Sequence, residues 1–104
     1  MGLLSIFGIG KGKIKDAIRK GAVIIDVRSA AEYDRGHIPH ALNIPADRIN
    51  VSIPRIKGLN KPVIICCNSG ERSSAAYGIL KQQGVKEVYN GGNWEKLLRI
   101  LRAV

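Results

Sequence analysis

The chain has 104 residues, of which 45% are hydrophobic and 24% are charged, values typical of globular proteins. This length suffices for one domain with a modest core, and the composition excludes a wholly disordered chain. The 17 Lys and Arg residues exceed the 8 Asp and Glu residues, and the resulting net charge of +9 favours anionic partners. Aromatic residues make up only 5% of the chain, and no nucleic-acid-binding module is visible, so the sequence predicts no nucleic-acid ligand.

The two cysteines of the chain, Cys66 and Cys67, are adjacent. Such a pair is unlike the disulfide framework of a small secreted protein. The N-terminus lacks the charged start and the cleavage site of a secretory signal, and no apolar segment is long enough to span a membrane. We therefore expect a cytoplasmic protein that does not enter the membrane.

The first residues, 1–12, are rich in glycine and have no clear periodicity, which predicts a flexible N-terminal arm. Apolar residues then recur at i, i+3 and i+4 from Ile14, which predicts a short amphipathic helix ending at Gly21. The remainder, residues 13–104, is expected to form a single domain.

A continuous apolar run over residues 22–27 contains one carboxylate, Asp26. Such a run is typical of a parallel strand covered on both faces. Ser29 and Glu32 have the spacing of a capping box, which predicts a short helix that ends at Gly36.

Further along the chain, a short strand is expected at residues 42–44, between two prolines. Residues 47–57 predict a helix that Pro54 should break or end. The apolar residues 63–67 predict a second buried strand, which ends in the thiol of Cys67.

The last third of the chain predicts a helix from residue 73 to about Gln83, a strand over residues 85–89, a turn at residues 90–92 and a helix over residues 94–101. Alternating strands and helices predict an α/β domain with a small, mainly parallel sheet flanked by helices on both faces. Ligands of such sheets bind beyond the carboxyl ends of the strands, where Cys67 is expected.

The loop that follows Cys67 has the composition of an anion site. Gly70 permits a tight turn with positive φ, and the main-chain N–H groups of the loop converge with the positive end of the next helix. Together with the guanidinium of Arg72 they would stabilise a thiolate, the nucleophile for sulfur, acyl or phosphoryl transfer. The candidate anion-binding residues are Asn68, Ser69, Gly70, Glu71, Arg72 and Ser73.

The two cysteines are expected to have different roles. Period 2 in a strand points Cys66 away from Cys67, so Cys66 is interpreted as a buried small hydrophobe. An inert core thiol is the alternative interpretation of Cys67, and the Gly and Arg that follow it argue against that alternative.

Several other residues have a catalytic and a structural interpretation. Asp26 and Arg28 are candidate supporting charges of the site, or else a structural pair, and Glu32 is a further partner for Arg28. His37 is interpreted as a structural histidine, and Trp94 as a core anchor of the last helix.

Four blocks together resemble the single-domain rhodanese family, the thiosulfate-type sulfurtransferases. They are Asp26–Tyr33, Gly36–Pro45, the loop Cys67–Ser73 with its Cys-x-x-Gly-x-Arg-Ser pattern, and Gly91–Trp94. With their connections they extend over about residues 14–101. The resemblance implies a rhodanese-like α/β domain.

The resemblance also implies a persulfide mechanism. The thiolate of Cys67 takes the outer sulfur of thiosulfate or another persulfide donor and passes it to a thiol or to cyanide. Arg72 and the loop amides stabilise the negative charge. The cysteine is itself the carrier, so neither a metal nor an organic cofactor is implied. The implied partners are a small anionic sulfur donor, a thiol acceptor and a sulfur-relay protein, and the protein is expected to be a monomer.

Two alternatives remain beside this function. One is a persulfide-relay or interaction module of the same fold with little turnover. The other is a phosphatase or arsenate reductase, which the loop length argues against. The loop from Cys67 to Arg72 has six residues, and the related cell-cycle phosphatases have a loop one residue longer.

The chain departs from the family pattern at His40, where the family usually has Gly, and at Glu71, inside the loop. His40 would crowd a turn or face solvent. Glu71 offsets the charge of Arg72, which predicts weak use of free thiosulfate. Replacing Glu71 by Lys is accordingly expected to lower the apparent KM for thiosulfate.

Overall fold

The computed structural model describes residues 12–104. A helix over residues 12–19 comes first. The elements that follow are β1 (Val23–Asp26), α2 (Ala30–Asp34), β2 (Leu42–Asn43), the 3-10 turn η1 (Ala46–Arg48), α3 (Ile49–Gly58), β3 (Val63–Cys67), α4 (Glu71–Gln82), β4 (Val88–Asn93) and α5 (Trp94–Ala103). The chain is therefore an α/β protein, as its alternating pattern predicts.

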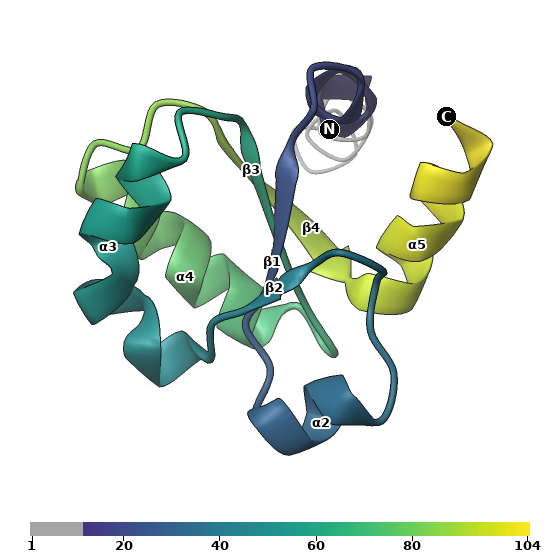
Figure 1. Cartoon of the computed structure of the whole chain (residues 1–104), viewed down its shortest axis with the longest axis horizontal. Helices are drawn as coiled ribbons and strands as arrows, with labels where there is room; N and C mark the ends of the chain where they lie inside the picture. The colour runs from purple at the N-terminus through teal and green to yellow at the C-terminus, as the bar shows by residue number, and fades with distance from the viewer. Residues whose placement is uncertain (1–11) are drawn as a thin grey trace, which may run out of the picture.

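The four strands form one sheet in the order β2-β1-β3-β4, and every neighbouring pair is parallel (Figure 1). The register aligns Asp26 of β1 with Asn43 of β2 and with Cys66 of β3. It also aligns Cys67 with Asn93 of β4. Because the strands are parallel, their carboxyl ends meet at one edge of the sheet.

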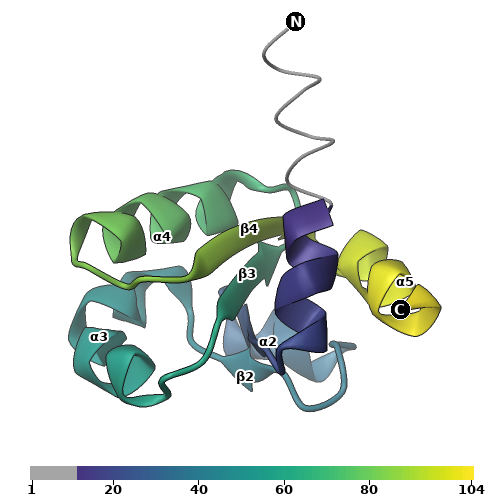
Figure 2. The same ribbon diagram turned by 90° about the horizontal axis from the view of Figure 1, so that it is seen from above.

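Helices cover both faces of the sheet, as predicted. Figure 2 shows α3 and α4 on one side, and α5 with the helix over residues 12–19 on the other. Each face buries its own core. The core on the α3 and α4 side includes Ile25, Ile49, Ile65 and Leu80, and the core on the α5 side is built around Ile64 and Leu97. Strands buried on both faces explain the continuous apolar runs of the sequence.

The last strand differs from its prediction. The sequence predicts a strand over residues 85–89 and a turn over residues 90–92, whereas β4 runs from Val88 to Asn93. Gly91 allows this path, because a Cβ at this position would lie 2.9 Å from Ile64 Cγ2 and 3.0 Å from Leu97 Cδ2. The strand therefore passes where a side chain does not fit, and a register shift between Ile65 and Cys66 accommodates it.

Pro54 lies inside α3 and does not end it, contrary to the prediction. The buried side chains of Ile49 and Ile56 flank Pro54 and fix the helix to the core. Pro54 has no N–H to donate to the carbonyl of Asn50, so α3 lacks this one hydrogen bond, at a position where both residues are exposed.

The other helix boundaries follow the sequence closely. The capping box of α2 is formed in full, because the Ser29 side chain accepts from Glu32 N and the Glu32 side chain accepts from Ser29 N. The helix α4 begins at Glu71, two residues before the predicted start, and ends one residue before the predicted end at Gln83.

The predicted N-terminal arm, residues 1–12, lies outside the described residues except for Gly12, which belongs to the helix over residues 12–19. Within residues 12–104, no helix combines the length and the apolar character needed to cross a membrane.

Candidate functional site

The carboxyl edge of the sheet collects the last residues of all four strands. These are Asp26 of β1, Asn43 of β2, Cys67 of β3 and Asn93 of β4. Asp26 and Cys67 are fully buried, and the two asparagines are half-buried. The edge therefore carries a thiol among polar groups, at the place where α/β sheets bind ligands.

The sulfur of Cys67 lies in a cradle of hydrogen-bond donors. The main-chain N–H of Gly70 donates to Sγ at 3.0 Å, and that of Ser73 donates to it at 3.4 Å. The thiol donates to Ser73 Oγ at 3.3 Å, and this hydroxyl donates to the carbonyl of Gly70 at 3.1 Å. Two N–H groups directed at one sulfur atom stabilise a negative charge on it.

Gly70 gives the loop its shape. Its φ of 92° lies in the left-handed region, and it is the N-cap residue of α4. The turn places the first residues of a 12-residue helix next to the sulfur. The positive end of the helix dipole thus adds to the two N–H groups.

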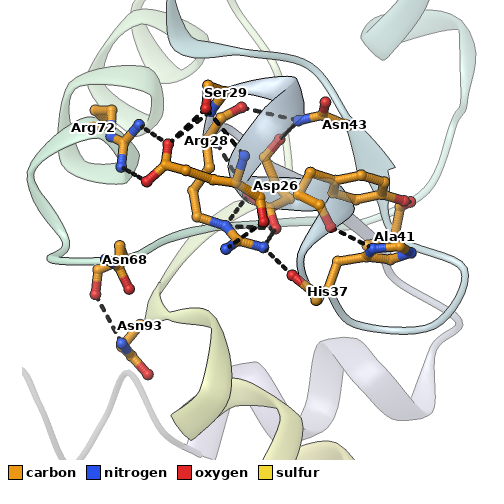
Figure 3. A network of polar contacts seen from close by, with 12 residues as sticks. Asp26, Arg28, Ser29, His37, Ala41, Asn43, Asn68, Arg72 and Asn93 are labelled. Atoms are coloured by element: carbon orange, nitrogen blue, oxygen red, sulfur yellow. Dashed lines mark hydrogen bonds and ion pairs between the residues drawn. The ribbon is translucent and has the colours of Figure 1, made fainter.

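Arg72, the expected anion ligand, forms an ion pair with the carboxylate of Glu32. Its Nη1 lies 2.7 Å from Glu32 Oε1, and its Nη2 lies 3.0 Å from Glu32 Oε2 (Figure 3). The hydrogen bond from Arg72, with the one from Ser29, lowers the pKa of Glu32 to about 2. The same carboxylate raises the pKa of Arg72, to which the nearby Cys67 adds a smaller contribution. Within residues 12–104, Arg72 makes no hydrogen bond to Cys67.

Arg28 forms the structural pair with Asp26 and not with the carboxylate of Glu32. Its Nη2 lies 2.7 Å from Asp26 Oδ2, and its Nε donates to Asp26 Oδ1 at 3.0 Å. From Glu32 it contacts only the main-chain carbonyl, because the carboxylate is turned towards Arg72. The Asp26 carboxylate, through its hydrogen bonds, raises the pKa of Arg28. The guanidinium also stacks over the ring of Trp94, 4.7 Å from its centroid, which ties β1 to α5.

The other predicted residues of the loop are exposed. Asn68, Ser69 and Glu71 face solvent, and Ser73 is buried below them. Sequence reasoning missed Asn93, whose Nδ2 donates to the carbonyl of Asn68 at 2.8 Å (Figure 3). Its Oδ1 also caps α5, and an Asn directly before an amphipathic helix is a signal that could have identified this residue.

A further polar group braces the edge from the side of β1. Asn43, also missed, donates from Nδ2 to the carbonyls of Asp26 and Arg28 at 3.0 and 2.9 Å. His37 is exposed, and its ring stacks on Tyr33 with 3.7 Å between the ring centroids. This arrangement agrees with the structural interpretation of the histidine.

His40 and Trp94 are the last two residues that the sequence singles out. His40 adopts a φ of 69°, in the left-handed region, and faces solvent. Its side chain therefore does not crowd the turn, although its backbone has a conformation that glycine adopts more easily. Trp94 packs partly buried against the core on the α5 side, in agreement with the role of an anchor.

The two cysteines lie on opposite faces, as period 2 predicts. Cys66 belongs to the core on the α5 side, and Cys67 to the core on the α4 side. Burial and, to a smaller extent, the charge of Asp26 raise the pKa of Cys66, so this thiol stays protonated. Of the two thiols, Cys67 is the one whose sulfur accepts hydrogen bonds from the loop.

The chain is similar to several known proteins. The sequence model of the Rhodanese-like domain family matches residues 11–95. Thiosulfate sulfurtransferase GlpE of Pseudomonas fluorescens is 36% identical over 72 residues, which cover 68% of this chain and 64% of GlpE. A tRNA sulfurtransferase of Thermoplasma acidophilum is 33% identical over 78 residues, 74% of this chain but only 15% of that protein.

Among solved structures, a rhodanese with anions from E. coli is 32% identical to this chain, with a TM-score of 0.65. The match covers 71% of this chain and 88% of that one. The chain spans less than two thirds of the length of these two curated relatives. The protein belongs to the rhodanese-like domain family.

Proposed function

We propose that this protein is a sulfurtransferase that carries sulfane sulfur as a persulfide on Cys67. The observation that supports this function most directly is the cradle of Cys67, in which the N–H groups of Gly70 and Ser73 both donate to Sγ. The names of the relatives, thiosulfate sulfurtransferase and tRNA sulfurtransferase, agree with sulfur transfer.

The proposed reaction has two steps. The Cys67 thiolate attacks the outer sulfur of a donor such as thiosulfate, the S–S bond of the donor breaks, and sulfite leaves with the bonding electrons. In the second step an acceptor thiolate or cyanide attacks the outer sulfur of the Cys67 persulfide, and the Cys67 thiolate is released. The cysteine supplies all the covalent chemistry, so this function needs neither a metal nor an organic cofactor.

The cradle serves both states of the cysteine. Ser73 Oγ accepts from the protonated thiol and donates to Gly70 O. When the thiol ionises, the hydroxyl can rotate and donate to sulfur instead. The main-chain donors need no rearrangement, which is the advantage of a preorganised site.

A sulfur-relay module with little turnover is a second candidate, favoured by one observation. Cys67 is 0% exposed, so a donor reaches Sγ only when part of the structure around the sulfur moves. A partner protein that opens the loop would supply that motion. In either role we propose a monomer acting in a reducing compartment such as the cytoplasm, with a small anionic donor, a thiol acceptor and a relay protein as partners.

The test is mass spectrometry of the intact protein after incubation with thiosulfate and, separately, with glutathione persulfide. We expect a gain of one sulfur atom that maps to Cys67 and is removed by cyanide as thiocyanate. Cys67→Ser should gain none, and Cys66→Ser, the matched control on the other face of the sheet, should load like the wild type. A sulfur atom found on Cys66, or none with either donor, would contradict the proposed function.

A further inference from the structure

We infer that Glu32 determines donor specificity, because it pairs with the loop arginine, offsets its charge at the sulfur site and so favours an organic persulfide over thiosulfate. This inference rests on the proposed function and adds the chemical class of the donor. It assigns a role to a residue of α2, outside the loop that carries the cysteine.

The pair between Glu32 and Arg72 has the geometry of a strong interaction. Two parallel N–H···O contacts of 2.7 and 3.0 Å join the guanidinium and the carboxylate. Such bidentate pairs are more specific and stronger than single contacts. An incoming anion that binds Arg72 must therefore displace a carboxylate that already uses both ends of the guanidinium.

The carboxylate of Glu32 is also oriented by Ser29, independently of Arg72. Glu32 Oε1 accepts from Ser29 N and from Ser29 Oγ, both at 3.0 Å. This is the capping box of α2, which orients the Glu32 side chain independently of the loop. Little side-chain entropy is lost when Arg72 joins an acceptor that is already oriented.

The charge left at the sulfur site follows from this arrangement. Gly70 and Ser73 present neutral N–H groups to Sγ, and the charge of Arg72 is offset by Glu32. Glu71 adds a negative charge on the exposed side of the loop. A dianion such as thiosulfate gains little from this site, whereas a donor of low charge loses little in entering it.

An organic persulfide in its protonated form, R–S–SH, has no charge on the two sulfur atoms that enter the site, whatever charges R carries. The Cys67 thiolate attacks the outer sulfur of R–S–SH, the S–S bond of the donor breaks, and R–S⁻ leaves with the bonding electrons. The proton stays on the transferred sulfur, so the products are Cys67–S–SH and the thiolate R–S⁻. The leaving thiolate carries one negative charge, in contrast to the doubly charged sulfite released from thiosulfate.

The test compares kcat/KM for thiosulfate and for glutathione persulfide, with cyanide as acceptor. Glu32→Gln removes the charge and keeps a residue that can complete the capping box. We expect its kcat/KM for thiosulfate to rise about tenfold, the effect of one charge-assisted hydrogen bond, with a change below about twofold for glutathione persulfide. Adding Arg72→Gln to Glu32→Gln should abolish the gain.

Asp34→Asn is the matched control, because it removes an exposed carboxylate from the same helix, and among the described residues Asp34 forms no ion pair with the loop. Its ratio of the two kcat/KM values should equal that of the wild type, and thermal unfolding of each variant shows whether it is folded. An equal loss with both donors in Glu32→Gln, or a gain that persists without Arg72, would overturn this inference while leaving Cys67 as the carrier. Absence of persulfide on wild-type Cys67 with both donors would instead overturn the proposed function and, with it, the inference.

Discussion

Gly70 controls the orientation of the N–H group nearest to the Cys67 sulfur. Its φ of 92° is accessible to glycine and costs other residues about 1 kcal/mol or more. A Cβ at this position meets no atom within 4 Å, so the cost of a substitution is conformational and not steric. The side-chain-free residue is therefore required by the shape of the loop.

For this reason we expect Gly70→Ala to lower the free energy of unfolding by about 1 kcal/mol and to slow sulfur loading of Cys67. Gly78→Ala is the matched control in the same helix, because Gly78 is exposed and a Cβ there also meets nothing. That substitution should instead stabilise the protein by about 0.5–1 kcal/mol. Urea unfolding and the loading rate measure both effects, and equal behaviour of the two variants would refute the explanation.

Because of Glu32, the free energy of unfolding depends on pH under acidic conditions. Its pKa is about 2 in the folded protein and 4.5 in its unperturbed state, so the unfolded chain binds the proton first as the pH falls. The stabilisation by the pair is complete above pH 4.5 and is lost between 4.5 and about 2.

We therefore expect the difference in Tm between the wild type and Glu32→Gln to be constant near neutral pH and to shrink towards pH 2. In an Arg72→Gln background the same comparison should give a smaller difference with a weaker dependence on pH. A difference in Tm that grows as the pH falls would show that the sign of this linkage is wrong.

At the scale of the elements, one buried ion pair joins β1, α2 and α5. Arg28 binds the carboxylate of Asp26, the carbonyls of Glu32 and Gly36, and the face of Trp94. Asp26 is 0% exposed and Arg28 is 5% exposed, so neither charge is solvated if its partner is removed. The pair thus holds the segment after β1 in the position from which Glu32 reaches the loop.

Removing the charge of Asp26 should be costly. We expect Asp26→Asn to lower the free energy of unfolding by about 3 kcal/mol, since the buried guanidinium loses its counter-charge. The double variant Asp26→Leu/Arg28→Met, which removes both charges, should recover much of that loss. Urea unfolding provides the comparison, and a loss below about 1 kcal/mol for Asp26→Asn would mean that water reaches the pair.

Some of the helices and strands can be predicted from local sequence patterns alone, and others cannot. Apolar runs and the capping box of Ser29 are local, and they identified β1, β3 and α2 correctly. The strand β4 was misplaced because its middle, Asn90 to Gly92, has the composition of a turn. The close approach of Ile64 and Leu97 explains why this strand has a glycine at position 91.

At the scale of the whole molecule, the net charge of +9 opposes the compact state. Three lysines, Lys57, Lys61 and Lys86, surround one cavity of about 400 Å³ at the opposite end of the sheet from Cys67. Salt shortens the range of this repulsion, because the Debye length falls from about 30 Å at 0.01 M to about 8 Å at 0.15 M.

We expect Tm to rise by about 4 °C over this range of sodium chloride, which corresponds to about 1 kcal/mol. The triple variant Lys57→Glu/Lys61→Glu/Lys86→Glu, whose net charge is lower, should show a smaller rise. Differential scanning calorimetry measures both proteins. A Tm that falls with salt in the wild type would mean that attractive ion pairs outweigh the repulsion.

Local patterns in the amino-acid sequence are enough to predict the α/β alternation, the placement of Cys66 and Cys67 on opposite faces, and the turn at Gly70. These features follow from local periodicity and from the dihedral angles open to each residue. The tertiary structure alone decided that Arg72 binds Glu32, that Arg28 binds Asp26, and that Asn93 holds the loop. Arg72 and Glu32 lie 40 positions apart, and the partner that a charge finds at such a separation depends on how the elements pack and not on local spacing.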